Sequence, residues 1–428
     1  MTSVPDRSHT EESIALPVPL HLGLLGLGTV GSAVARLSRD DAPRFHSQGV
    51  TPVVTAALVR DALRPRAASQ LTPLLTSDVE RFFAAPIDVM VEALGQAEPA
   101  RTLVGRALEA GIPVVTANKT LIAAHGDELL DLARRTGTVL RYEATCIAGV
   151  PFLGTFERRP FARRVRAVTG ILNGTSNAIL SALAAGTAFS DALADAQRRG
   201  LAEPDPSADI TGADAGQKLT ILVRLFGGLR VAPASIPSQP LDVLDVLDVT
   251  AARAFDGYVK PLACASWSGS DVRAFVSPAF VDGAHPLARV SHVINGVVLD
   301  AHGGPQCFIG PGAGPEVTAS TLLDDVIEVV AQRSPSRSIT GTTVAATVSH
   351  PETRWFVRIP GSARPSDLAD LLGSFGIWCE RLSAIGDRTY ALTFPATRDR
   401  IGAATAALAS VTTGATAAIP ALTGDAAC

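Results

Sequence analysis

The strongest constraint on the fold of this chain is a glycine-rich turn that joins a short apolar strand to a helical pattern near the start of the sequence. Residues 21–25 predict the strand, residues 26–31 read GLGTVG, and apolar residues at helical spacing follow. Glycines permit the tight turn and let a pyrophosphate approach the N–H groups at the amino end of a helix. The spacing alone is not specific, but this order of elements predicts a dinucleotide-binding unit. The expected cofactor contacts in the turn are Gly26, Gly28, Thr29, Val30 and Gly31.

Strand patterns recur after this turn and alternate with helical stretches. We expect the strands at residues 53–59, 89–92, 114–116 and 139–142. Such alternation is typical of a parallel sheet with crossover helices. Residues 21–150 therefore predict a Rossmann-type α/β domain that binds a dinucleotide.

The end of the second strand is where such domains usually select their cofactor. Arg60 follows the strand directly, with Arg64 and Arg66 nearby, and these guanidinium groups can pair with the 2′-phosphate of NADP. Asp61 can instead accept hydrogen bonds from the ribose hydroxyls of NAD. We expect NADP because Arg60 comes first after the strand, and NAD is the alternative.

A second informative stretch, residues 200–218, contains four carboxylates and a single lysine. Pro204 and Pro206 disfavour a helix, so Glu203 is expected on an extended or turning segment. Asp214 and Lys218 are four residues apart, which places them on one face of a predicted helix that continues as an apolar stripe.

Two interpretations of this acidic stretch are open from these residues alone. Glu203 and Asp214 can bind a substrate ammonium while Lys218 passes a proton to or from a hydroxyl or carbonyl. Alternatively, Thr211-x-x-Asp214 fits a capping box, and an Asp–Lys pair at this spacing can be a solvated helix pair that contributes roughly a few tenths of a kcal/mol.

Composition describes a globular chain of 428 residues with two or three domains. The formal net charge of −4 argues against a nucleic-acid or anionic-membrane surface. The five cysteines lack CxxC spacing, so we expect no disulfide framework and no zinc site, and a reducing cytoplasm fits best. Residues 1–20 lack the features of a signal peptide and are expected to be a disordered leader. No run approaches the roughly twenty apolar residues that span a bilayer.

Beyond residue 150 the pattern changes to that of an α+β domain with a mixed sheet, expected over residues 151–310. Strands are predicted at 165–172, 272–276 and 293–299, with a short amphipathic helix in the Leu-Asp-Val repeat of 241–249. The GPGAG loop at 310–314 precedes a helical run, and residues 311–335 are expected to return to the nucleotide-binding domain. An ordinary turn before a helix is the alternative.

The C-terminal part, residues 350–428, follows a stretch of Ser, Thr and Arg at 333–350 that is expected to be a linker. Its patterns predict strand, helix, strand, strand and helix. They favour a small βαββαβ domain.

Eight ordered motifs give the chain a specific resemblance from residue 21 to about residue 325. They are GLGTVG at 26–31, VEALG at 91–95, VVTANKTLIAAHG at 114–126, YEATCIAGVP at 142–151, ILNGTSNAIL at 171–180, GLAEPDPSADITGADAGQK at 200–218, HPLA at 285–288 and GPGAG at 310–314. In these motifs the chain resembles homoserine dehydrogenase. The tail from residue 354 looks like an ACT domain, a ligand-sensing module.

The resemblance implies reversible reduction of L-aspartate 4-semialdehyde to L-homoserine, a step toward threonine, isoleucine and methionine, by a homodimer or dimer of dimers. Lys218 matches the family's proton donor, and Lys119 matches a second lysine between cofactor and substrate. Glu203 and Asp214 match substrate-binding acids, with Asp209 as a supporting acid. A free lysine titrates near pH 10.4, so acid–base work requires a lowered pKa or alkaline conditions. The implied cofactor contacts also include Gly95, Lys119, Gly200 and Gly312.

The resemblance further implies a monovalent cation, such as sodium, that organises the hinge between domains. Its ligands would be the Glu143 carboxylate and the carbonyls of Cys146, Ala148 and Val150. The alternative for Glu143 is an ordinary buried ion pair.

Several residues depart from the family pattern. Leu201 replaces an aromatic residue that can contact the substrate, Ile147 puts a β-branched side chain in a glycine-rich turn, and Gln96 replaces a glycine. The loop after Ile359 lacks the acidic residue that opens an ACT effector loop. These departures keep two further hypotheses open: a dehydrogenase for a different amino alcohol, and a catalytically idle nucleotide-binding sensor.

Overall fold

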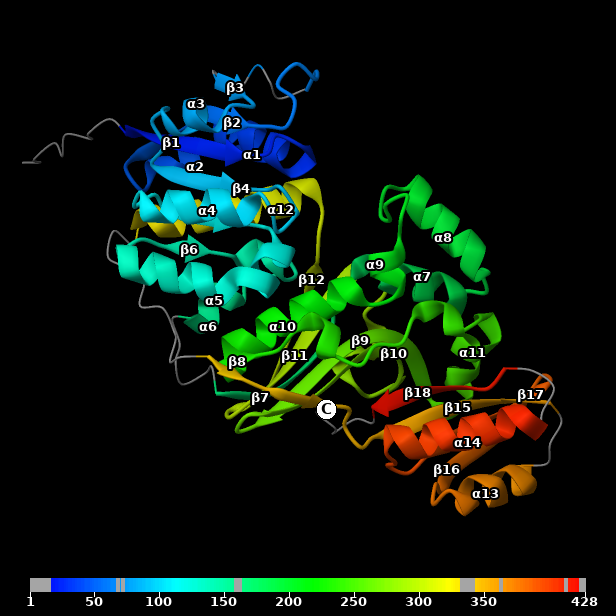
Figure 1. The fold of residues 1–428 in the computed structure, drawn as a ribbon. Helices are drawn as coiled ribbons and strands as arrows, with labels where there is room; N and C mark the ends of the chain where they lie inside the picture. The colour runs from blue at the N-terminus through cyan, green and yellow to red at the C-terminus, as the bar shows by residue number, and fades with distance from the viewer. Residues whose placement is uncertain are drawn as a thin grey trace, which may run out of the picture.

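The computed structural model describes residues 17–66, 70, 74–157, 164–331, 343–361, 365–411 and 415–422. It arranges them in a nucleotide-binding domain, a substrate domain and a C-terminal domain (Figure 1). The predicted leader lies outside the described residues up to residue 16, and its last three residues already belong to strand β1. None of the described helices is long and apolar enough to cross a membrane.

The nucleotide-binding domain contains a six-stranded parallel sheet in the order β3-β2-β1-β4-β5-β6. This confirms the predicted Rossmann-type sheet. The order reverses between β1 and β4, so the loops that follow these two strands meet at the carboxyl edge, where such sheets bind ligands. The strands are β1 (Val18–Leu25), β2 (Val50–Leu58), β3 (Leu74–Thr76), β4 (Val89–Glu92), β5 (Val114–Thr116) and β6 (Leu140–Arg141).

Helices cover both faces of this sheet and bury two separate apolar cores. Helix α12 packs beside α1 although about 280 residues separate them in sequence, so the chain returns to this domain after building the next one (Figure 1). One face carries α1 (Thr29–Asp40), α2 (Pro43–His46) and α12 (Pro315–Ala331), and the other α3 (Val79–Phe83), α4 (Ala100–Glu109) and α5 (Lys119–Thr136).

The substrate domain has five antiparallel strands in the order β12-β11-β7-β9-β10. The sequence patterns did not predict β9 or β12. The strands are β7 (Val165–Ile171), β9 (Gly257–Ser268), β10 (Asp271–Asp282), β11 (Ile294–Ala301) and β12 (Gly304–Pro311). The helices are α6 (Leu153–Glu157), α7 (Gly174–Ala184), α8 (Phe189–Arg198), α9 (Ser207–Ile210), α10 (Ala213–Gly227) and α11 (Val246–Ala251). Short 3₁₀ turns lie at Glu143–Thr145, Pro233–Ser235, Leu241–Val243, Ala252–Phe255 and Pro286–Arg289.

The C-terminal domain has the predicted βαββαβ order, with an antiparallel sheet β18-β15-β17-β16. Strand β18 also pairs in parallel with β10, which makes the sheets of the two domains continuous and the combined sheet mixed. The elements are β15 (Arg354–Pro360), α13 (Pro365–Ser374), β16 (Cys379–Ile385), β17 (Arg388–Thr393), α14 (Arg398–Val411) and β18 (Ala417–Leu422).

The prediction of a linker at 333–350 is wrong for residues 343–350, the part of this range that the structure describes. Strand β13 (Val344–Ala345) pairs with β8 (Leu229–Arg230), and β14 (Thr347–Ser349) pairs with β10. Backbone hydrogen bonds to distant strands, which a local pattern does not reveal, order these residues.

A buried charge network also fastens the C-terminal domain to α11. Asp248, only 1% exposed, pairs with Arg358 and Arg388 and accepts a hydrogen bond from the Tyr390 hydroxyl at 2.9 Å. Asp245 caps α11 and pairs with Arg388 at 2.6 Å. The Leu-Asp-Val repeat, predicted as one amphipathic helix, is therefore a turn and a capped helix whose aspartates serve this interface.

Replacement of Asp248 by alanine is expected to lower the free energy of unfolding by about 3–5 kcal/mol, because it removes the buried carboxylate that pairs with Arg358 and Arg388 and accepts the Tyr390 hydroxyl. Thermal unfolding with limited proteolysis of the C-terminal domain measures this. Asp256→Asn removes the charge of an aspartate that is 84% exposed and pairs with Arg381, and it keeps a side chain that tolerates the φ of +60° at this position, so it should change neither readout. Equal effects of the two substitutions would contradict the assignment.

Candidate active site

Helix α10 carries the acid–lysine pair and lies between the two larger domains (Figure 1). It begins after Gly212, whose φ of +83° few other residues adopt without strain, and nearly all of its side chains are buried. It contacts α5 on one side and strands β7 and β9 on the other. The capping-box interpretation of Thr211 is wrong, because the residue before the helix is Gly212 and no side chain caps it.

Asp214 forms the centre of a three-residue charge cluster. Its Oδ1 lies 2.9 Å from Lys119 Nζ, and its Oδ2 lies 2.8 Å from Lys218 Nζ. Lys218 Nζ also donates a hydrogen bond to the Leu172 carbonyl at 2.7 Å. The Asp214 and Lys218 side chains are only 9% and 11% exposed, so the pair is not a solvated surface pair. Lys119 comes from α5, which means that two domains build the cluster.

The charges in this cluster shift one another's protonation. Burial opposes ionisation of Asp214, but the two ammonium groups outweigh it and hold the pKa of Asp214 well below its usual range. This carboxylate therefore stabilises the fold above its ordinary pKa and loses that contribution in acid. Burial acts to lower the pKa of Lys119, yet the attraction of Asp214 raises it overall. Of the two conditions given for acid–base work, a lowered pKa is not met by Lys119, and alkaline conditions stay as the alternative.

Lysine is scarce in this chain, and this scarcity is a sequence signal that could have pointed to the site. Of the 37 basic residues only three are lysines, and two of them are in this cluster. The third, Lys260, is buried on β9, where burial lowers its pKa to about 8. Arginine supplies the other positive charges, so the pairing of two of the three lysines with one carboxylate marks this site.

Asn173 is a site residue that sequence reasoning missed. Its Nδ2 donates hydrogen bonds to Asp209 at 2.7 Å and to Asp214 at 2.8 Å. Its Oδ1 accepts from the Ser176 N–H at 2.7 Å and so caps α7. Burial, with Asp214 nearby, raises the pKa of Asp209. An asparagine at a helix start is a recognisable signal, but its contact with two distant acids is not.

The structure does not bring Glu203 into the cluster. Glu203 is exposed, and its carboxylate makes no hydrogen bond or ion pair with the residues that the structure describes. Gly200 lies in the same loop between α8 and α9, with a φ of +69° and no nucleotide-domain atom beside it. Leu201 packs against the apolar core of α7, α8 and α11, and its carbonyl accepts a hydrogen bond from Thr175.

The GLGTVG turn follows β1 and fits a dinucleotide phosphate. No side chain caps the amino end of α1, and Gly28 faces open space. A phosphate can therefore approach the helix amino end. A Cβ on Gly31 would lie 2.1 Å from the Gly26 carbonyl oxygen, so this position requires glycine. Gly95, after β4, is also open, and Arg60 is exposed at the end of β2.

Glu92, at the end of β4, was also missed by sequence reasoning. It is fully buried and accepts hydrogen bonds from the Thr116 hydroxyl, the Leu94 N–H at 2.7 Å and the Asn118 side chain at 3.2 Å. Asn118 in turn donates to the Gln96 carbonyl at 2.7 Å. Burial raises the pKa of Glu92. This network joins the loop after β4 to the residue that precedes Lys119.

Two of the predicted cation ligands, Glu143 and Ala148, accept hydrogen bonds in this structure. Both Glu143 carboxylate oxygens accept N–H groups at the start of α6, from Phe152 at 2.8 Å, Leu153 at 2.9 Å and Gly154. The Ala148 carbonyl accepts from the Thr321 hydroxyl. No group of three or more His, Cys, Asp or Glu that could hold a metal occurs among the described residues. Ile147 has a φ of +50°, a backbone conformation that a β-branched residue adopts only with strain.

Gly312 connects the GPGAG loop to the same segment. Its carbonyl accepts from the Ala148 N–H at 3.0 Å, and a Cβ on it would overlap the Asn295 side chain. The loop after β12 therefore lies against residues 146–150.

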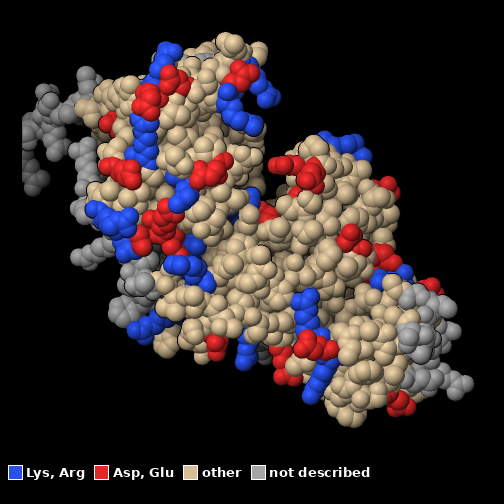
Figure 2. Space-filling model, in the orientation of Figure 1, with Lys and Arg blue, Asp and Glu red and all other residues tan. Residues whose placement is uncertain are grey.

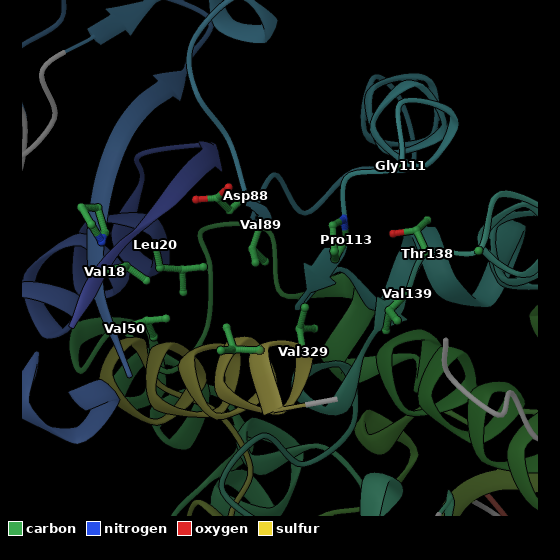
Figure 3. Close-up of a pocket in the computed structure, with 13 residues that line it drawn as sticks. Val18, Leu20, Val50, Asp88, Val89, Gly111, Pro113, Thr138, Val139 and Val329 are labelled. Carbon is green, nitrogen blue, oxygen red and sulfur yellow. The ribbon is translucent and has the colours of Figure 1, made fainter. Parts of the chain in front are cut away.

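The surface is indented between the nucleotide-binding and substrate domains, with acidic side chains on one rim (Figure 2). A separate hollow of about 380 Å³ lies at the opposite edge of the parallel sheet (Figure 3). It is lined by the starts of strands, including Val18, Val50 and Val89, and is remote from the GLGTVG turn. We assign it no role in the site.

The two glycines of the turn give a matched test. Gly31→Ala is expected to destabilise the fold by about 1–3 kcal/mol, because the added methyl group meets backbone. Gly28→Ala should leave the Tm unchanged and weaken dinucleotide binding, because its methyl group points into open space. Thermal unfolding and calorimetric titration with NADP separate the effects, and an equal loss of Tm in both variants would contradict this geometry.

Comparisons with known proteins agree along the chain. A family model described as "Homoserine dehydrogenase, NAD binding domain" matches residues 26–143, and one described as "Homoserine dehydrogenase" matches residues 151–327. The homoserine dehydrogenase of Synechocystis sp. is 36% identical over 72% of this chain and 73% of its own. That of Corynebacterium glutamicum is 34% identical over 83% of this chain and 82% of its own.

Solved structures show the same likeness. A homoserine dehydrogenase from Thiobacillus denitrificans superposes with a TM-score of 0.85 at 30% identity, covering 96% of this chain and 99% of that one. A hyperthermophilic archaeal homoserine dehydrogenase in complex with NADPH superposes with a TM-score of 0.60 at 25% identity, covering 75% of this chain and all of the other.

Proposed function

The chain belongs to the homoserine dehydrogenase family, and from this premise we propose how its residues carry out the family reaction. The reaction moves a hydride between L-homoserine and L-aspartate 4-semialdehyde. The observation that carries the proposal is Asp214 held between Lys119 and Lys218 at the junction of two domains. Neither lysine is needed by a protein that only binds nucleotide, which disfavours the idle-sensor hypothesis.

Lys218 is the group placed to exchange a proton with the substrate oxygen. An ammonium has three N–H donors. Those of Lys218 reach the Leu172 carbonyl and Asp214, which leaves one for a substrate oxygen. In the oxidation direction Lys218 must be deprotonated before it accepts the hydroxyl proton, so the rate should rise with pH.

The substrate ammonium needs a carboxylate other than Asp214, because each oxygen of Asp214 already pairs with a lysine and the two lysines together exceed its charge. Asp209 is half-buried beside Asp214 and is fixed by Asn173. Glu203 is exposed on the loop before α9, and its carboxylate contacts none of the three cluster residues. We therefore assign Asp209 the first ammonium contact and keep Glu203 as a second. Because Leu201 packs into a core, its departure from the family pattern does not favour a different amino alcohol.

Lys218→Met is expected to lower kcat for homoserine oxidation by about 10²- to 10⁴-fold with cofactor affinity retained, because it removes the proton-transfer group. The assay follows reduced-nicotinamide absorbance at alkaline pH, with a separate titration for cofactor binding. Lys260→Met is the matched control, since it removes a buried lysine outside the cluster and should keep kcat. Full activity of Lys218→Met would overturn the assigned role.

A nicotinamide dinucleotide supplies the hydride acceptor or donor when bound. The open Gly28, Gly95 and uncapped α1 fit its phosphates, and the NAD-binding family model covers these residues. We propose NADP rather than NAD because Arg60 is exposed directly after β2. The same assay with NADP and NAD in parallel tests this choice, and a preference for NAD would refute it.

A bound monovalent cation such as sodium is a separate proposal. Its ligands would be the Glu143 carboxylate, beside the N–H groups that it already accepts, and carbonyls from residues 146–150. A rise of Tm with sodium chloride but not with choline chloride would support it.

Further proposals concern context rather than chemistry. The βαββαβ domain supports an ACT-like role in ligand sensing or dimerisation, and a hollow of about 800 Å³ lies between it and the substrate domain.

We also propose a homodimer or dimer of dimers, a place in amino-acid biosynthesis toward threonine and methionine, and a cytoplasmic location. The four cysteines within the described residues are free, which fits a reducing compartment. Size measurement in solution and cell fractionation test the assembly and the location.

A further inference from the structure

We propose that Arg224 is a positioning residue that fixes the distance between Lys119 and the Asp214–Lys218 pair across the domain boundary. The inference rests on the roles proposed above for these three residues. Its basis is a buried polar contact between α5 and α10, two turns along α10 from the charge cluster, that the reaction itself does not use.

The Arg224 guanidinium is 7% exposed and reaches from α10 into α5. Its Nη1 donates to the Ile122 carbonyl at 2.5 Å and its Nη2 to the Ala123 carbonyl at 3.3 Å. Its Nε lies 2.8 Å from Asp127 Oδ1, an ion pair rather than an aligned hydrogen bond. The planar Arg224 guanidinium thus contacts two backbone carbonyls and one carboxylate of the nucleotide-binding domain. The ammonium of a lysine cannot reproduce this geometry.

These contacts fix both helices along their lengths. The α5 carbonyls that Arg224 holds begin one turn after Lys119, and Arg224 itself is six residues after Lys218, roughly 9 Å along the axis. Thr120 and Gln217 make a further hydrogen bond of 3.3 Å between the two ends. With Lys119–Asp214 at one end and Arg224 at the other, α5 and α10 cannot slide or splay without breaking a buried charge contact.

Gly126 is the position that admits the guanidinium. A Cβ on Gly126 would lie 2.4 Å from Arg224 Nη1, although the residue is inside a helix, where alanine is otherwise preferred. Arg230 approaches the same carboxylate from outside, with 57% exposure and its Nε 2.6 Å from Asp127 Oδ2. We call Arg224 and Gly126, which makes room for its guanidinium, the clamp. The exposed Arg230 does not reach the α5 backbone.

The test compares Arg224→Met, Arg224→Lys, Gly126→Ala and the double variant Arg224→Met with Gly126→Ala. Arg224→Met is expected to lower kcat for homoserine oxidation about 10- to 100-fold with the NADP dissociation constant unchanged. The reason is that α5 and α10 can then shift, so that Lys119 is no longer held at a fixed distance from the Asp214–Lys218 pair. Arg224→Lys should fall between this and the parent. Gly126→Ala should lower kcat in the parent, but cause no further loss in the Arg224→Met background.

Arg230→Met is the matched control and should keep both kcat and Tm. A purely structural role for Arg224 would lower Tm in Arg224→Met while the folded enzyme kept its kcat, and that result overturns the proposal. Additive losses in the double variant would overturn it as well. If Lys218→Met is inactive and Arg224→Met is not, only the clamp is refuted. If Lys218→Met is active, the roles on which the clamp rests are wrong.

Discussion

One buried carboxylate, Asp214, determines how the two larger domains can meet. A carboxylate with so little exposure is stable only with partners, and its two cations come from different domains. The nucleotide-binding domain must therefore present the amino end of α5 to the amino end of α10. The same contact brings the cofactor side and the substrate side of the reaction together, so that stability and chemistry depend on one interaction.

Helix α10 satisfies this constraint by being buried on nearly every side while carrying three charged side chains. Each charge is matched by a contact outside the helix: Asp214 by Lys119 and Asn173, Lys218 by the Leu172 carbonyl, and Arg224 by the α5 backbone. A polar network in a core fixes a unique arrangement only when all its members are satisfied. The apolar residues between these charges pack α10 into the core, and the charged contacts fix how α10 is positioned along its neighbours.

Local sequence was sufficient for features that depend on neighbours in the chain. The GLGTVG turn, the parallel strands and the Asp214–Lys218 face follow from spacing. Resemblance was needed for Lys119, because nothing local links residue 119 to residue 214. Asn173 and Glu92 were missed for the same reason, since their partners lie 36, 41, 24 and 26 residues away. Strand β9 escaped prediction because a strand buried on both faces has no alternating pattern.

The pairing of β18 with both β10 and β15 has a consequence for how the protein is made. Strand β18 is the element that joins the sheet of the C-terminal domain to that of the substrate domain, and it spans residues 417–422. A chain emerging from the ribosome can complete the nucleotide-binding and substrate domains first, with the edge of β10 beyond β14 still unpaired at residues 280–281. That edge stays open until residues 417–422 have been synthesised. During translation it is an open strand edge, the kind of surface on which nascent chains associate wrongly or recruit chaperones.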